Sequence, residues 1–282
     1  GQTRYYTSLD GKGAYWQVPM HDEASRDKVS FHTANSCWRF KVMPFGLASA
    51  PAIFCELMHR VLSPVLFGSA PTASSGPMTE GENKAEACAM NYMDDTLIAS
   101  HDIFAHARHL SYVLDLMRLA GLRFSAKKCV FGQRKVHVLG HVLDGVKGTI
   151  DPSPRHLQAI ANFTQPTDVS SVRSFLGIAT YYKDRIWCFS LLAAPLTDLT
   201  KKGREWRWGE EEDNAFKSIK ELLLSDPILR APDFEREFIV QTDFCRLAVA
   251  AILSQKDDEG REYVVQYASK KLNPAQQLWS SA

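Results

Sequence analysis

Two aspartates lie side by side in the stretch NYMDDTLIAS, residues 91–100, between two short apolar runs. Neighbouring carboxylates repel each other, so Asp94 and Asp95 together would be costly in a purely structural role. Hard divalent cations take oxygen ligands and require several of them at one place. A tight hairpin with both aspartates at its tip would provide two carboxylate ligands.

A third carboxylate is available from Asp10, which closes the strand-like stretch YYTSLD. Gly11 and Gly13 follow it and would let a triphosphate approach the backbone. Phosphoryl transfer needs charge neutralised and the attacking and leaving oxygens aligned, and two metal ions about 3.5–4 Å apart do both. A second interpretation stays open, because Asp-Asp between strands and Asp before Gly are both common in polar turns.

The hydrophobic pattern predicts the elements that would position these acids. Residues 5–10 are predicted as a strand, and a second strand should run up to Val42. A helix should follow, with Ser49 as its N-cap and Pro51 in its first turn. Its apolar face is predicted to contain Ile53, Leu57, Met58, Val61 and Leu62.

Residues 68–90 are rich in small and polar types and are predicted to form a loop insert. A second amphipathic helix should follow the aspartate pair and end at Gly121. Its apolar positions are Ile103, Ala107, Leu110, Leu114 and Met117. Residues 136–143 alternate apolar types, which predicts a strand with a tight bend at Gly140.

The pattern changes at the two prolines of DPSPRHLQAI, which mark a boundary, and helical patterns follow. Asp168 should cap one helix, and residues 213–224 should form another. Strand patterns return from Phe238. The order of elements predicts an α+β part, then a small helical part, then the beginning of a second α/β unit.

The 282 residues have ordinary globular composition, with 45% hydrophobic residues, 23% charged residues and a net charge of +1. A local run between Arg118 and Lys135 contains cations and no acid, which permits a polyanionic partner. The six cysteines form no CxxC pair, which favours a reduced, intracellular setting. No apolar run approaches the ~20 residues that cross a bilayer. Without a signal sequence or an initiating Met, the chain is expected to start partway into a longer protein.

A zinc site is the competing metal hypothesis. Cys129, His137 and His141 are candidate ligands, with the two histidines expected on one strand face. A fourth ligand is missing and the spacing matches no usual zinc finger, so this interpretation is much the weaker one.

Several stretches occur in an order that is far more specific than any one of them. They are SLDGKGAYWQVPM, FKVMPFGLASAPAIFCELM, NYMDDTLIAS, AGLRFSAKKCVFG and VHVLGHVLD, continued by RSFLGIATYYKDRI, LAAPLTDL, WRWGEEEDNAFKSIKELLLSDPIL and REFIVQTDF. The series resembles the successive motifs of reverse transcriptases, with a particular likeness to gypsy-type long-terminal-repeat retrotransposons. The likeness covers nearly the whole chain except residues 68–90.

The resemblance implies an RNA-directed DNA polymerase with a role for each matching residue. Asp10, Asp94 and Asp95 match the catalytic aspartates of the palm, which would hold two Mg²⁺ ions, with Mn²⁺ as the alternative. Tyr15 matches the aromatic residue that walls the sugar pocket and excludes a 2′-hydroxyl.

The resemblance also implies contacts with substrates. Phe45 and Gly46 match the stretch that contacts the incoming dNTP, and Lys127 and Lys128 match a lysine motif near its phosphates. The remaining matches concern the primer: Tyr92 and Met93 would pack beside its terminus, and Leu139, Gly140 and His141 would form the hairpin called the primer grip.

The implied fold is a polymerase palm, an antiparallel sheet packed by helices, followed by a helical thumb and a partial ribonuclease H-like α/β domain. The expected domains are residues 1–150, 151–205 and 206–282, with Asp243 matching the first ribonuclease acid. The implied partners are RNA or DNA template with primer, dNTPs and the rest of a pol polyprotein with its protease, ribonuclease H and integrase. The expected location is cytoplasmic, within retrotransposon particles, with no membrane.

The chain departs from the family pattern at both ends. The N-terminal fingers segment is absent, so weak or no polymerase activity is expected from this chain. Asp243 is a lone ribonuclease acid, so no RNA cleavage is expected. An inactive remnant that only binds nucleic acid is the alternative function. An RNA-copying polymerase would share the palm aspartates, but Tyr15 and the gypsy-like thumb count against it.

Overall fold

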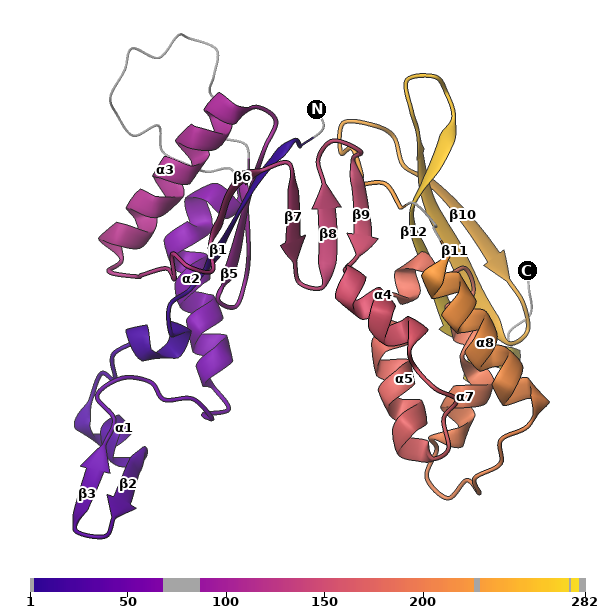
Figure 1. Ribbon diagram of the computed structural model, residues 1–282, viewed down its shortest axis with the longest axis horizontal. Helices are drawn as coiled ribbons and strands as arrows, with labels where there is room; N and C mark the ends of the chain where they lie inside the picture. The colour runs from indigo at the N-terminus through magenta and orange to yellow at the C-terminus, as the bar shows by residue number, and fades with distance from the viewer. Residues whose placement is uncertain (1–2, 68–86, 226–228, 274, 279–282) are drawn as a thin grey trace. The chain divides into compact units, whose positions relative to one another are not determined.

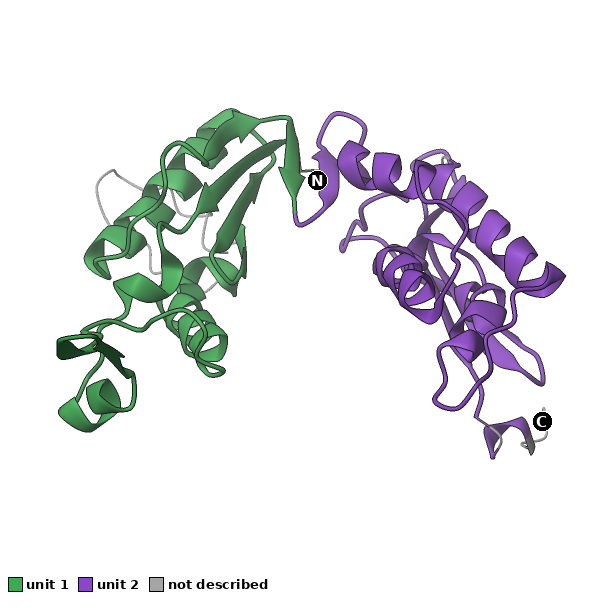
Figure 2. Ribbon diagram, turned by 60° about the horizontal axis from the view of Figure 1, so that its bottom comes forward, with its two compact units in different colours: residues 1–138 green, residues 139–282 purple. Residues whose placement is uncertain are grey.

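The computed structural model describes residues 3–67, 87–225, 229–273 and 275–278. The chain divides into two compact units, residues 1–138 and 139–282 (Figure 2). Each unit has a hydrophobic core of its own. Within the described part of the chain, no helix has both the length and the apolar character needed to cross a membrane.

Unit 1 is built on a four-stranded antiparallel sheet with the strand order β4-β5-β1-β6 (Figure 1). Its strands are β1 (Tyr5–Asp10), β4 (Ala89–Tyr92), β5 (Asp95–Ser100) and β6 (Val130–Gln133). The strand predicted at residues 5–10 is thereby confirmed. Most of the predicted loop at 68–90 lies outside the described residues, but its end was misjudged: Cys88 is buried and Ala89 begins β4.

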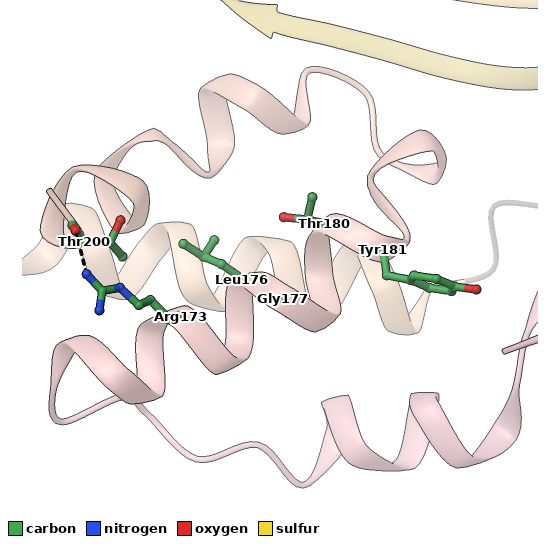
Figure 3. Close-up of a pocket in the computed structure, with 6 residues that line it drawn as sticks. All are labelled: Arg173, Leu176, Gly177, Thr180, Tyr181 and Thr200. Carbon is green, nitrogen blue, oxygen red and sulfur yellow. Dashed lines mark hydrogen bonds between the residues drawn. The ribbon is translucent and has the colours of Figure 1, made fainter. Parts of the chain in front are cut away.

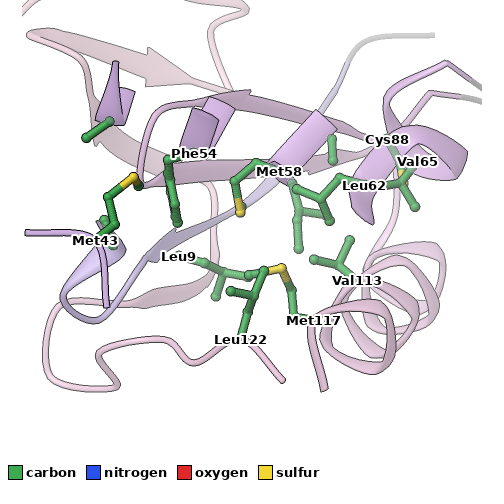
Figure 4. Packing of buried hydrophobic residues seen from close by; sticks show 14 residues of the cluster. Leu9, Met43, Phe54, Met58, Leu62, Val65, Cys88, Val113, Met117 and Leu122 are labelled. Atoms are coloured by element: carbon green, nitrogen blue, oxygen red, sulfur yellow. The ribbon is translucent and has the colours of Figure 1, made fainter. Parts of the chain in front are cut away.

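Two long helices pack on one face of this sheet, α2 (Ala50–Leu66) and α3 (Ile103–Leu119). Buried side chains from both helices meet the sheet in one cluster, which includes Leu9, Phe54, Met58, Leu62, Val113 and Met117 (Figure 4). The helices were predicted correctly, but their faces only in part. Ile53 and Leu114 are exposed, because Phe54 and Val113 next to them are the residues that reach the core.

The remaining elements of unit 1 are short. They are η1 (Ala14–Gln17), α1 (Glu23–Asp27), β2 (Ser30–Thr33), β3 (Ser36–Arg39) and β7 (Lys135–Val138). The strand predicted to reach Val42 ends at Arg39, where the Arg39 guanidinium forms ion pairs with Glu23 and Asp27 of α1. Ser49 is the N-cap of α2 as predicted, although its side chain makes no capping hydrogen bond.

Unit 2 begins at a two-residue turn, Leu139–Gly140, in which both residues have positive φ angles, 45° and 72°. The bend predicted at Gly140 is therefore confirmed, and it separates His137 on β7 from His141 on β8. The two histidines do not share a strand face, so this premise of the zinc hypothesis is wrong. No described group of His, Cys, Asp and Glu side chains could hold a metal ion with three or more ligands.

Helices and a second sheet make up the rest of unit 2. An antiparallel hairpin comes first, β8 (His141–Asp144) and β9 (Thr149–Pro152). The helices are α4 (Pro154–Ala161), α5 (Val169–Tyr181), η2 (Lys183–Arg185), α6 (Phe189–Leu192), α7 (Ala194–Leu199), α8 (Glu210–Leu224) and η3 (Gln276–Leu278). The antiparallel sheet β10-β11-β12 contains β10 (Ile239–Phe244), β11 (Ala248–Lys256) and β12 (Glu262–Lys271).

Asp168 caps α5 through a hydrogen bond of 2.6 Å from the Ser171 backbone N–H, as predicted. The core of unit 2 lies between these helices, where Phe175 of α5 packs on Phe216 of α8 with ring centroids 4.6 Å apart. The turn at the start of unit 2 and the helices after it are therefore parts of one packed body.

Candidate active site

The end of β1 and the start of β5 bring two of the predicted acids together. Asp10 pairs directly with Asp95 in the antiparallel register. Side chains of directly opposite residues lie on the same face of a sheet, with Cβ atoms about 4.5–5.5 Å apart. Leu9 and Thr96, the preceding and following residues on these strands, are buried, and Leu9 belongs to the core under the helices. Because successive side chains of a strand point to opposite faces of the sheet, the carboxylates of Asp10 and Asp95 lie on the face away from the helices.

Asp94 is held beside this pair by the backbone. It lies in the turn between β4 and β5, where the preceding residue, Met93, has a φ of 53°. The Asp94 carbonyl accepts a hydrogen bond of 2.8 Å from the Gly11 N–H. A Cβ atom on residue 11 would lie 3.3 Å from the Asp94 carbonyl oxygen, which is a tight contact, so Gly11 eases this close approach. Strand pairing and this hydrogen bond thus bring the backbones of the three aspartates together from two distant segments of the chain.

Three negative charges at one place affect one another. Burial raises the pKa of Asp95, and the charges of Asp94 and Asp10 raise it further, while Lys128 acts in the opposite direction. The Lys128 ammonium lies 3.2 Å from Asp10 Oδ2, and the Asp10 side chain is only 19% exposed. In the described conformation the three carboxylates are not gathered into a three-ligand set, and Asp10 is directed to Lys128.

The segment that carries Lys127 and Lys128 is fixed to the end of β1. The Ser125 N–H donates to the Asp10 carbonyl at 2.8 Å, and the Lys128 N–H closes a turn on the Ser125 carbonyl. Both lysine side chains are exposed. The structure therefore places the Lys128 ammonium beside Asp10, and the role of the two lysines at the phosphates stays a prediction.

Tyr15 and Phe45 are brought together from separate segments, with ring centroids 5.3 Å apart. Tyr15 also meets the core residue Phe54 edge-on at 5.8 Å, which fixes its ring. Phe45 is exposed, and Gly46 next to it has a φ of 92°, a left-handed conformation that glycine adopts without strain. Tyr15 is therefore held between a core ring and an exposed ring.

Gln17 was not predicted as part of the site. Its side-chain Nε2 donates to the carbonyls of Lys12 at 2.8 Å and Arg123 at 3.0 Å, and its Oε1 accepts from the Arg123 N–H at 2.6 Å. The amide side chain therefore connects the segment after Asp10 to the segment before the lysines. Sequence offers no signal for the contact with Arg123, which lies 106 positions from Gln17.

The residues expected at the primer are found in two places. Tyr92 and Met93 are at the tip of the β4–β5 hairpin in unit 1, where both are exposed. Leu139, Gly140 and His141 form the turn at the start of unit 2. Burial lowers the pKa of His141, and its hydrogen bond to the Leu139 carbonyl acts the other way.

Two further features lie in unit 2. Asp243 is an exposed residue of β10 and pairs with Ala250 of β11. On α5, a shallow pocket is lined by Arg173, Leu176, Gly177, Thr180, Tyr181 and Thr200 (Figure 3). The Arg173 guanidinium at its edge donates to the Thr200 carbonyl at 3.1 Å.

A comparison with protein families decides which kind of protein has this arrangement. The family described as reverse transcriptase (RNA-dependent DNA polymerase) matches residues 1–143, about half of the chain. The chain belongs to the reverse transcriptase family. The family described as an RNase H-like domain found in reverse transcriptase matches residues 208–282.

Curated relatives of this reverse transcriptase chain are polyproteins of transposons. The retrovirus-related Pol polyprotein from transposon 297 of Drosophila melanogaster is 32% identical over 97% of the chain, which spans 23% of that relative. The transposon Tf2-3 polyprotein of Schizosaccharomyces pombe is also 32% identical, over 98% of the chain and 19% of the relative. The chain thus spans about a fifth of the length of these relatives. The likeness to gypsy-type elements within the family stays a prediction.

Solved structures with the same fold come from a foamy viral protease-reverse transcriptase. Its complex with an RNA/DNA hybrid is 19% identical with a TM-score of 0.76, and covers 98% of this chain and 34% of the other. A second structure, in complex with double-stranded DNA, has 19% identity, a TM-score of 0.78 and coverages of 99% and 45%. This likeness confirms the expected palm and ribonuclease H-like fold.

Proposed function

We propose that this chain is the polymerase region of a retrotransposon polyprotein and adds deoxynucleotides to a primer paired with an RNA or DNA template. The observation that carries the proposal is the direct pairing of Asp10 with Asp95, with Asp94 bonded beside them. Membership of the reverse transcriptase family supports it, because polymerases of this family generally depend on divalent metal ions.

Asp10, Asp94 and Asp95 would hold two Mg²⁺ ions. The donor set is chemically suited to hard divalent cations, since its ligand atoms are carboxylate oxygens. Asp10 and Asp95 lie on one face of the sheet, and Asp94 is next to Asp95 along the chain. When bound, such ions supply charge neutralisation and alignment of the attacking and leaving oxygens. Asp10 must turn from Lys128 to take part, which would leave the Lys128 ammonium free for the phosphates of a dNTP.

The neighbouring side chains would select and orient the dNTP. Tyr15 is fixed by Phe54 and Phe45, so its ring would form a rigid wall against the sugar and exclude a 2′-hydroxyl. The exposed ring of Phe45 and the unhindered backbone at Gly46 would contact the incoming nucleotide. Lys127 would add positive charge beside Lys128.

Residues 151–205 would act as the thumb and hold the duplex by its backbone, which makes binding salt-sensitive. The pocket on α5 supports this role, because Gly177 leaves its centre open and Arg173 supplies a cation at its edge. Residues 206–282 would form the ribonuclease H-like domain, with Asp243 on β10 at the position of its first acid. The chain's other partners would be the remaining domains of the polyprotein.

Primer extension with separate dNTP and NTP pools tests the polymerase function. The wild-type chain with Mg²⁺ or Mn²⁺ should incorporate dNTPs in preference to NTPs. Asp94→Asn should lower the rate about a hundredfold or more, since metal ligands contribute several kcal/mol to the transition state. Asp115→Asn is the matched control, because this exposed acid of α3 pairs only with a surface arginine in the described structure.

Binding of Mn²⁺, followed by electron paramagnetic resonance, separates the alternatives if extension is weak. Binding that is lost in Asp94→Asn and kept in Asp115→Asn supports a built metal site. A wild-type chain that binds a template–primer without binding Mn²⁺ would be the inactive remnant instead. Equal use of NTPs would favour an RNA-copying polymerase.

A further inference from the structure

Hydrogen bonds from side chains and from the backbone hold the turn at Leu139–Gly140. The Gly140 carbonyl accepts from the Tyr182 hydroxyl at 2.7 Å and from the Ser153 N–H at 2.9 Å. A carbonyl oxygen has two lone pairs, so both are used here. Tyr182 is only 1% exposed, which makes its hydroxyl a fixed donor.

His156 in turn fixes the Tyr182 hydroxyl. Its Nδ1 lies 2.5 Å from the Tyr182 oxygen. Because the single hydroxyl proton of Tyr182 is donated to Gly140, the Nδ1 atom of His156 must carry the proton of this second bond. The result is a directed chain from His156 through Tyr182 to the Gly140 carbonyl.

The neighbouring carbonyl, of Leu139, is held in the same way. It accepts from the Tyr181 hydroxyl and from His141 Nδ1, the latter at 3.0 Å. The rings of Tyr181 and Tyr182 meet edge to face, with centroids 5.0 Å apart, and each lies 5.4 Å from the His141 ring. The two tyrosines are consecutive residues at the C-terminal end of α5, so one helix end holds both carbonyls of the turn.

Packing adds to the hydrogen bonds. A Cβ atom on residue 140 would lie 2.9 Å from His156 Cε1 and 3.3 Å from Tyr181 Cε1. Only glycine therefore fits between the two rings, at a φ of 72° that also favours glycine. The helix end and the turn are fitted to each other closely enough to move together.

We propose that Tyr181 and Tyr182 are positioning residues that fix the primer-grip turn to the thumb helix α5 and so set the place of the primer's recessed 3′ end. The inference rests on the proposed function, in which this turn contacts the primer. Leu139 suits that contact, since its side chain is exposed while its carbonyl is held from behind. A displacement of α5 on the duplex would be passed to the turn through the two hydroxyls.

Tyr182→Phe tests this directly, because it removes the hydroxyl and keeps the ring. Tyr181→Phe is the second variant, and its half-exposed position makes it tolerant of change. The matched control is Tyr263→Phe, which removes a hydroxyl that donates to Gln255 at 3.1 Å on the β11–β12 strand pair. Amide hydrogen exchange at residues 139–141 reports on the turn. Fluorescence anisotropy with an RNA/DNA hybrid, either blunt or with a recessed primer end carrying 2-aminopurine, reports on the primer.

Each phenylalanine variant should speed exchange at residues 139–141 about fivefold, as expected for the loss of one hydrogen bond. Each should also weaken binding of the recessed hybrid by a similar factor and alter the 2-aminopurine signal. Binding of the blunt hybrid should be unchanged in these variants, and Tyr263→Phe should change neither exchange nor binding. Unchanged exchange in both variants, or equal weakening of both hybrids, would overturn the inference. A wild-type chain that binds both hybrids alike would refute the proposed primer contact itself, which distinguishes the two failures.

Discussion

Asp10 at the end of β1, Asp94 just before β5 and Asp95 at its start place three carboxylates next to one another, and this has a cost for stability. Like charges directly opposite each other in antiparallel strands are destabilising. Burial and the charges of the two neighbouring carboxylates raise the pKa of Asp95, and the positive charge of Lys128 offsets only part of this rise. Such an arrangement is expected where a site is built for a ligand rather than for the stability of the free protein.

We therefore predict that Asp95→Asn stabilises the metal-free chain while it removes a metal ligand. The gain should be below about 1 kcal/mol, because Asp95 is partly exposed and its charge is screened. In thermal unfolding with a chelator present, the midpoint should rise by about 1 to 2 °C. Asp115→Asn, the exposed control, should leave the midpoint unchanged or lower it. A lower midpoint for Asp95→Asn would contradict the argument.

His106 is a second residue with a predicted effect on stability, through pH. It is 2% exposed, with Nε2 2.7 Å from Thr7 Oγ1 and Nδ1 3.0 Å from Ser100 Oγ. Burial lowers its pKa below the ordinary 6.5, and nearby His109 lowers it further. The unfolded chain therefore binds a proton at a higher pH than the folded one, so the stability that depends on neutral His106 is lost as pH falls below about 6.5.

The measurement is the free energy of unfolding at pH 7.5 and pH 5.5 for the wild type and His106→Gln. One such group contributes at most about 1.4 kcal/mol per pH unit. The prediction concerns the difference between the two proteins: the wild type should lose more stability on acidification than His106→Gln does. Equal losses in the two proteins would show that His106 is not the responsible group.

At the scale of elements, the site depends on how the segment after Asp10 is joined to the segment before Lys127. Backbone bonds connect Lys12 to Arg123 and Ser125 to Asp10, and the Gln17 side chain extends this pairing by three hydrogen bonds. An amide side chain can do this because it donates and accepts at once, like a peptide group.

Gln17→Ala should accordingly destabilise unit 1 by about 1–2 kcal/mol, a discounted sum for three partly solvated hydrogen bonds. Denaturant unfolding measures this change. Gln133→Ala is the control, because within the described residues the Gln133 side chain makes one exposed hydrogen bond, to the carbonyl of Phe131 two residues away. If the two substitutions cost the same, the Gln17 bonds do not connect the segments in solution.

The elements also show what sequence can and cannot predict. Strand β1 and the hairpin at Asp94 were predictable because polar residues end short apolar runs. The buried face of α3 was not predictable, since one of its buried positions is taken by the polar residue His106. This side chain fits there because the hydroxyls of Thr7 and Ser100 in the sheet form hydrogen bonds with its two ring nitrogens. The Tyr182 bond to Gly140 joins residues 42 positions apart and leaves no periodic signal.

At the scale of the molecule, the two hydrophobic cores are composed of different segments. Among the described residues, the first core contains Phe54 and Met58 of α2, and all its side chains come from residues 9–129. The second contains Phe175 and Phe216, and all its side chains come from residues 160–223. The order of motifs predicts three domains, residues 1–150, 151–205 and 206–282, and that division stays a prediction. The packing gives two compact units, with the boundary after residue 138. Each core should therefore respond to its own substitutions.

Met58→Ala and Phe175→Ala form a matched pair for this last prediction. Both side chains are almost wholly buried, so each truncation should leave a cavity, at a cost of about 2–5 kcal/mol for Met58→Ala and about 3–5 kcal/mol for Phe175→Ala. Amide exchange resolved by residue should show lost protection in β1, β5, α2 and α3 for Met58→Ala, and in α5, α7 and α8 for Phe175→Ala. Because the cavity affects only the side chains that packed on the lost atoms, protection in the other unit should be kept. Equal loss across both units in either variant would show that the chain unfolds as a single cooperative body.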